Sequence, residues 1–227
     1  MDEERLESLM KKLKFQNVLQ YVAIPRIRIK DVSSNSTLAA ASEGRRESRQ
    51  KRSMGSKDEF DGTGRRDLQM VFDKLHDKKG VTTILKVVVD DLGPSPHTDE
   101  AIESSLKHRG VETWDWRRVD LCSEVIYNAA PTVREVHLYW SGNNAVLRSW
   151  CDEGGLKMLQ DLTAVDVHVQ PVSTAGFMNI HLDNRLVCAD MGVGRIRIHS
   201  SDGEIPGVFY ESDEESLPQR QSNHPWS

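Results

Sequence analysis

Val81-Thr-Thr-Ile-Leu-Lys-Val-Val-Val-Asp90 decides the fold class of this chain. Such a run of β-branched and aliphatic residues is typical of a strand that is buried on both faces of a sheet. Further apolar runs lie over 111–116, 133–140 and 164–169, and segments with helical periodicity separate them. The alternation predicts an α/β fold: a mostly parallel sheet of at least four strands with crossover helices, half of a doubly wound, Rossmann-like layer.

The rest of the chain is expected to flank this layer. Four regions are predicted: an amphipathic helix and connector over 1–30, a disordered linker over 31–66, the α/β domain over 67–171, and an irregular region over 172–227. The linker is rich in Ser, Gly and charged residues, so it buries too little apolar surface to offset its ordering entropy. The last region is expected to hold one hairpin around Asp202-Gly203, followed by a disordered acidic tail.

Two stretches outside the layer admit more than one interpretation. Apolar residues at helical spacing within 3–21 fit a partner-docking helix or a membrane-surface helix, and the glutamates near its start favour docking. Pro25 makes 22–29 an edge strand or an extended connector. The basic cluster over 44–52 fits a nuclear-import or nucleic-acid patch, but the acidic residues around it favour a solvated linker.

Composition narrows the class of protein. The formal net charge of −5 argues against a general nucleic-acid binder, and no apolar run is long enough for a membrane span. Cys122, Cys151 and Cys188 are too few for a disulfide framework, and their spacing does not fit zinc. The acidic amino terminus is unlike a secretory signal. We therefore expect an intracellular, cytoplasmic protein that contacts neither nucleic acid nor membrane.

Polar residues follow several of the predicted strands. Because open parallel sheets bind ligands beyond the carboxyl ends of their strands, these residues are candidates for a metal or phosphate site. The alternative is that they begin turns and cap helices, which needs no ligand. The main candidates are Asp90, Asp91, Ser141, Asn143 and Asn144, with Asp115 and Arg117 near the second strand.

Motifs for a bound cofactor are missing. Neither G-x-G-x-x-G nor the P-loop pattern occurs after the first strand, so no nucleotide cofactor is expected. The histidines at 97, 108, 137 and 168 are scattered, and none has the spacing of a zinc site. His137 and His168 lie inside strand patterns, where a satisfied, partly buried imidazole is commoner than a metal ligand.

An aromatic group accompanies the same strands. These side chains fit either a pocket or interface, where aromatic residues act as anchors, or the packing of helices on the sheet. The group consists of Trp114, Trp116, Tyr139, Trp140 and Trp150.

Several long strings in the central segment agree, in order, with one known group of proteins. They are Val81-Thr-Thr-Ile-Leu-Lys-Val-Val-Val-Asp-Asp91, His97-Thr-Asp-Glu-Ala-Ile102, Glu112-Thr-Trp-Asp-Trp116, Asp120-Leu-Cys-Ser-Glu-Val-Ile126, the run from Ala130 to Arg148 that contains His-Leu-Tyr-Trp-Ser-Gly-Asn-Asn, and Val167-His-Val-Gln170. Together they resemble the amino-terminal region of large fungal intracellular proteins that carry a subtilisin-like serine protease (peptidase S8) domain further along. The match covers about 67–170.

The resemblance implies a protein partner rather than a catalytic centre. A subtilisin-like site needs a Ser, a His and an Asp, but no His-Gly dipeptide and no Gly-Thr-Ser-x-Ala string occurs in the chain. We expect a non-catalytic accessory module whose partner is a protease domain or a regulatory protein. The alternatives are a small ligand- or metal-binding enzyme, and a serine-type peptidase by family association alone. After Gln170 the chain departs from the family, as expected of a shortened member or a truncated gene model.

Overall fold

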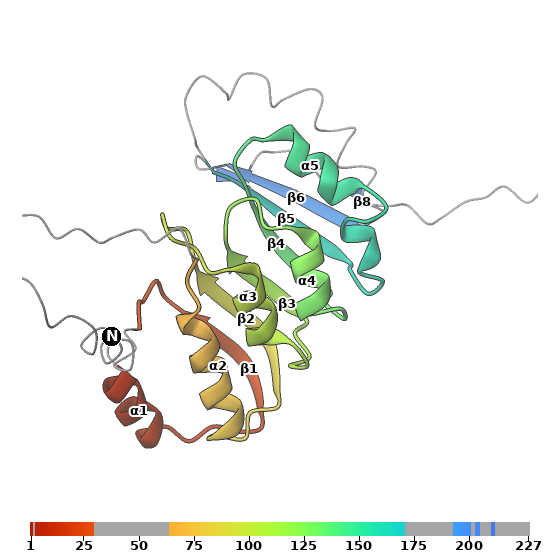
Figure 1. Cartoon of the computed structure of the whole chain (residues 1–227). Helices are drawn as coiled ribbons and strands as arrows, with labels where there is room; N and C mark the ends of the chain where they lie inside the picture. The colour runs from red at the N-terminus through yellow and green to blue at the C-terminus, as the bar shows by residue number, and fades with distance from the viewer. Residues whose placement is uncertain (2, 30–63, 171–192, 201–202, 205–209, 212–227) are drawn as a thin grey trace, which may run out of the picture.

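The chain builds one sheet in which β1 to β6 lie side by side in their order along the chain (Figure 1). A computed structural model describes residues 1, 3–29, 64–170, 193–200, 203–204 and 210–211. The elements are α1 (Glu3–Lys12), β1 (Val18–Ile24), α2 (Asp67–Asp77), β2 (Thr83–Asp90), α3 (Asp99–Leu106), β3 (Thr113–Arg117), α4 (Ser123–Ala129), β4 (Glu135–Trp140), α5 (Asn144–Cys151), the 3₁₀ turn η2 (Leu156–Met158), β5 (Ala164–Val169), β6 (Arg195–Ser200), β7 (Gly203–Glu204) and β8 (Tyr210–Glu211).

Strands β1 to β6 are all parallel, and each pairs with the next one along the chain. The predicted α/β fold with a parallel sheet is therefore confirmed. The strand order never reverses, so the sheet has no switch point of the kind that forms the ligand crevice in doubly wound folds. The short strands β7 and β8 both pair with β6 in the antiparallel direction.

The crossover helices cover one face of the sheet. Connections between neighbouring parallel strands are right-handed, and a sheet that grows in one direction therefore places every such helix on the same side. Figure 1 shows α2, α3 and α4 in a row on one side of the strands, and α2 packs on α3 while α3 packs on α4. Within the described ranges, none of the helices α2, α3, α4 and α5 covers the opposite face.

The hydrophobic core lies between this helix layer and the sheet. Four of the five candidate aromatic residues lie in it: Trp114, Trp116, Trp140 and Trp150 are each at most 2% exposed. The Trp116 ring stacks on Phe72 of α2, with 6.3 Å between ring centroids. These indoles therefore join the helices to the sheet, while Tyr139 projects from β4 to the other face.

The sheet extends beyond the expected range of 67–171. The helical pattern expected within 3–21 ends at Lys12, and the Val-Leu-Gln-Tyr-Val-Ala-Ile run that follows forms β1, the edge strand beside β2. The β-branched and aromatic residues of this run favour a strand over a continuation of the helix. At the other end β6 joins β5, and β7 pairs with β6 through His199 and Glu204, while Asp202 of the expected hairpin lies outside the described residues.

Most of the expected linker, and the acidic tail after residue 211, lie outside the described residues. No helix in the described ranges is long and apolar enough to cross a membrane.

Candidate functional site on the helix-free face

The face of the sheet opposite α2–α5, here called the helix-free face, is polar over β3–β6. Side chains alternate between the two faces along each strand, so every second residue of these strands projects from it. In these strands the residues of the helix-free face are Thr113, Asp115 and Arg117; Glu135, His137 and Tyr139; Ala164, Asp166 and His168; and Arg195, Arg197 and His199.

One row across this face centres on the carboxylate of Asp166. His137, Asp166 and Arg197 are register partners on β4, β5 and β6. The Asp166 carboxylate accepts two hydrogen bonds of 2.6 Å from the Arg197 guanidinium, and Nε2 of His199 lies 2.8 Å from it. Burial disfavours its charge, but the bonds from Arg197 and His199 prevail and lower the pKa of Asp166. Asp166 is therefore a buried anion held by cationic neighbours.

A second row is a stack of aromatic rings. Tyr139, His168 and His199 are register partners, and the centroids of successive rings lie 4.8 and 4.7 Å apart. Burial, together with the nearby rings of His199 and His137, lowers the pKa of His168 to about 4. The His168 imidazole is therefore neutral at pH 7. The Tyr139 hydroxyl donates a 2.7 Å hydrogen bond to Asp115, and burial together with that bond raises the pKa of Tyr139.

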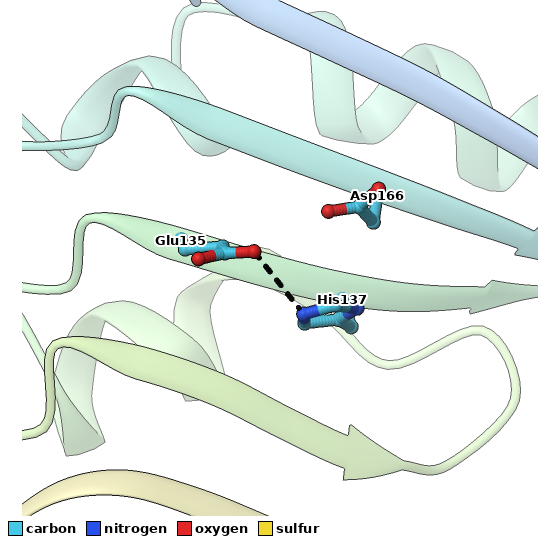
Figure 2. A group of neighbouring side chains, drawn as sticks. All are labelled: Glu135, His137 and Asp166. Carbon is cyan, nitrogen blue, oxygen red and sulfur yellow. Dashed lines mark ion pairs between the residues drawn. The ribbon is translucent and has the colours of Figure 1, made fainter.

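Two residues of the first row and Glu135 form a group of side chains of the kinds that bind metal ions. Glu135 and His137 come from β4 and Asp166 from β5, and Figure 2 shows them on the same side of the two strands. One ligand atom from each lies within 4.8 Å of the other two. Nδ1 of His137 is 3.2 Å from Nε2 of His168, whereas Nε2 of His137 is buried, has no hydrogen bond among the described residues, and lies 3.5 Å from Oε1 of Glu135.

A separate buried network occupies the carboxyl end of β2. The His97 ring lies between two carboxylates, with Nδ1 2.9 Å from Asp91 and Nε2 2.9 Å from Asp67. Asp91 also accepts hydrogen bonds from the His97 backbone N–H and from the indole of Trp116. Arg65 pairs with Asp67 at 3.0 Å. The network ties the start of α2 to the loop that follows β2.

The charges of this network stabilise one another. Burial opposes the charge of His97, but the hydrogen bonds to Asp67 and Asp91 outweigh burial and raise the pKa of His97. Burial likewise opposes the two carboxylates, yet their bonds from His97 lower the pKa of both, helped by Arg65 at Asp67 and by Trp116 at Asp91. The two carboxylates therefore favour the protonated form of His97.

The other candidate ligands at the carboxyl ends of the strands pair with nearby side chains or cap a helix. Asp90 faces Arg26 at 3.5 Å, and Ser141 donates its hydroxyl to Asp120. The Asn143 side chain accepts a 3.0 Å hydrogen bond from the Ala145 N–H and so caps α5, in which Asn144 is the exposed first residue. Among the described residues, no hydrogen bond or ion pair joins the Asp90–Asp91 pair to the loop after β4, because β3 lies between β2 and β4.

Sequence reasoning missed the helix-free face as a site. Its signal is the strict alternation of Val-Asp-Val-His-Val in β5 and Arg-Ile-Arg-Ile-His in β6, where every second residue is polar. The fold and this face define an α/β protein with an all-parallel, sequentially ordered sheet that is covered by helices on one side. No protein-family model, curated protein or solved structure matches the chain.

Proposed function

We propose that this chain is a non-catalytic α/β accessory module that positions or regulates a subtilisin-like serine protease. The segment whose strings resemble the fungal proteins, about 67–170, coincides with the continuous run from α2 to β5. The resemblance thus covers a unit of strands and helices with a shared core rather than scattered pieces. The resemblance also supports a fungal source and a cytoplasmic location for this protein.

The proposal that the chain is non-catalytic rests on the hydrogen-bond partners of its imidazole rings. Subtilisin-like serine proteases need an imidazole hydrogen-bonded to the hydroxyl of the nucleophile. Throughout the described part of the chain, each hydrogen bond of an imidazole ring goes to a carboxylate or to another imidazole. His97 in particular is locked between two carboxylates, which leaves neither ring nitrogen for a nucleophile.

Two measurements test the proposal. The purified chain is incubated with a fluorophosphonate probe, and no serine is expected to be labelled because none is activated by a base. The chain is then mixed with the separately produced protease domain of a fungal protein whose amino-terminal region resembles residues 67–170. Co-elution in size-exclusion chromatography and a changed rate of peptide hydrolysis are expected.

An unrelated α/β protein of similar size serves as the control in the mixing experiment. Labelling of any serine in this chain, or the absence of a complex at micromolar concentrations of both proteins, would falsify the proposal.

A further inference from the structure

We propose that Glu135, His137 and Asp166 bind a divalent transition-metal ion of the zinc class on the helix-free face. Glu135 and His137 are two residues apart on β4 and so share a face, and Asp166 is the register partner of His137 on β5. The three ligand atoms lie within 4.8 Å of one another. Ligands at about 2.0–2.2 Å from zinc stand about 3.4 Å apart in a tetrahedron, so small side-chain rotations close the site. The site does not depend on the proposed protein partner.

The free nitrogen of His137 faces the other two ligands. Its Nδ1 is engaged by His168 at 3.2 Å, which leaves Nε2 as the nitrogen available to a metal. Nε2 is buried, has no hydrogen bond, and is 3.5 Å from a Glu135 oxygen. An unsatisfied buried polar atom is costly, and a cation between the nitrogen and the carboxylate would satisfy both. The ring of His168 meanwhile orients His137, as the outer partners of metal-bound histidines do.

Asp166 keeps room for a metal while it holds Arg197. A carboxylate offers about four lone-pair positions. On Asp166, Oδ1 accepts from Nε of Arg197 and faces Nε2 of His199, whereas among the described residues Oδ2 accepts one hydrogen bond, from Nη2 of Arg197. One position on Oδ2 is therefore left for a metal without breaking the Arg197 pair. Arg197 and His199 then fix the ligating carboxylate from behind.

Charge and ligand type select the metal. Glu135 and Asp166 contribute two negative charges and Arg197 one positive charge, so the cluster carries a charge of −1 when its imidazoles are neutral. Nη2 of Arg197 also forms an ion pair with Oε1 of Glu135 at 3.6 Å, a distance too long for a hydrogen bond. One imidazole nitrogen and two carboxylate oxygens suit Zn²⁺ or Co²⁺, whereas Mg²⁺ prefers an all-oxygen, hydrated shell. The partly exposed Glu135 leaves the remaining coordination positions to water.

The test uses the full chain after treatment with EDTA. Zn²⁺ is titrated calorimetrically, and Co²⁺ is followed by its visible absorption, which reports coordination by nitrogen and oxygen ligands. We expect saturable binding of one Zn²⁺ at this site and a Co²⁺ spectrum that excess Zn²⁺, but not excess Mg²⁺, abolishes. Glu135→Gln and His137→Ala each remove a ligand and are expected to weaken binding by more than the about 10–100-fold that outer-shell changes cost.

Glu124→Gln is the matched control, because Glu124 is an exposed carboxylate on α4, outside the sheet. It should bind Zn²⁺ as the unmodified chain does. Glu135→Gln preserves the shape of the side chain, so this variant should fold, and circular dichroism checks that it does. It therefore still tests the proposal if His137→Ala does not fold. The proposal is overturned if the unmodified chain binds no Zn²⁺, or if folded Glu135→Gln binds it with undiminished affinity.

Discussion

The Asp91 carboxylate accepts a 3.0 Å hydrogen bond from the indole of Trp116, which lies on the neighbouring strand β3. Asp91 is 2% exposed and also holds the His97 ring and backbone N–H, whereas its neighbour Asp90 is partly exposed and contacts Arg26 and the Leu92 N–H. Two adjacent aspartates therefore have opposite roles, one internal and one at the surface.

Replacing Asp91 should destabilise the fold far more than replacing Asp90. Asp91→Ala leaves the His97 imidazolium and the Trp116 indole without their buried partner, and it should lower the free energy of unfolding by about 3–5 kcal/mol. Asp90→Ala removes one surface ion pair and should cost less than about 1 kcal/mol. Urea denaturation of the two variants measures both values. Equal losses would show that the Asp91 network does not hold the loop.

Stability should fall at alkaline pH because His97 is charged in the folded state. The pKa of His97 is raised above its ordinary value of about 6.5, so the folded state binds this proton more tightly than the unfolded state. The contribution is complete below about pH 6 and is lost as the pH rises through the raised pKa. The stability difference between the unmodified chain and His97→Gln should therefore shrink from pH 6 to pH 9. A difference that stays constant or grows would contradict this assignment.

Arg197 and Arg195 lie on the same strand but should respond differently to truncation. Arg197→Ala removes both hydrogen bonds that the guanidinium donates to the buried Asp166 carboxylate, and it should lower the free energy of unfolding by about 2–4 kcal/mol. This loss is smaller than the about 3–5 kcal/mol expected for a fully buried ion pair, because Arg197 is partly exposed. Arg195→Ala removes an exposed side chain and should change stability by less than about 0.5 kcal/mol. Thermal unfolding of both variants gives the comparison, and similar melting temperatures would refute it.

Two consecutive glycines after α5 provide a test of close packing. A Cβ on Gly155 would lie 2.4 Å from the backbone oxygens of Ser149 and Trp150, whereas a Cβ on Gly154 would meet nothing within 4 Å. Gly155→Ala must displace the end of α5 and should cost about 1–3 kcal/mol. Gly154→Ala should be neutral or stabilise by up to about 1 kcal/mol, because it restricts the unfolded chain. Denaturation midpoints check the pair, and a loss for Gly154→Ala as large as that for Gly155→Ala would oppose it.

The α/β layer was predicted well from the sequence where the strands are rich in apolar, β-branched residues. The apolar runs of β2 to β5 are buried by helices on one face and by neighbouring strands on both edges, so they carry a strong signal. Strand β1 was predicted only in part: an edge strand was one of two expectations for 22–29, whereas residues 18–21 were assigned to the helical pattern that in fact ends at Lys12. Local periodicity does not tell a helix from a strand when the deciding contact, with β2, lies far along the chain.

The candidate site was harder to predict than the fold. His137 and Asp166 meet only through the register of β4 with β5, and their separation in sequence matches no ligand motif. The expected site at the carboxyl ends rested on a general rule for open sheets, but the partners of Asp91 come from α2, β3 and the loop before α3. Long-range partners of this kind leave no trace in local spacing.

Because strand order equals chain order, the entropic cost of assembling the sheet is uneven. From β2 to β5 each pairing closes over one or two short helical elements, whereas β1 and β2 must come together across the chain from Ile24 to Thr83. Loop-closure entropy rises with the number of residues enclosed, and contacts between nearby residues form faster. The centre of the sheet is therefore the kinetically favoured nucleus, and β1 docks onto an already formed neighbour.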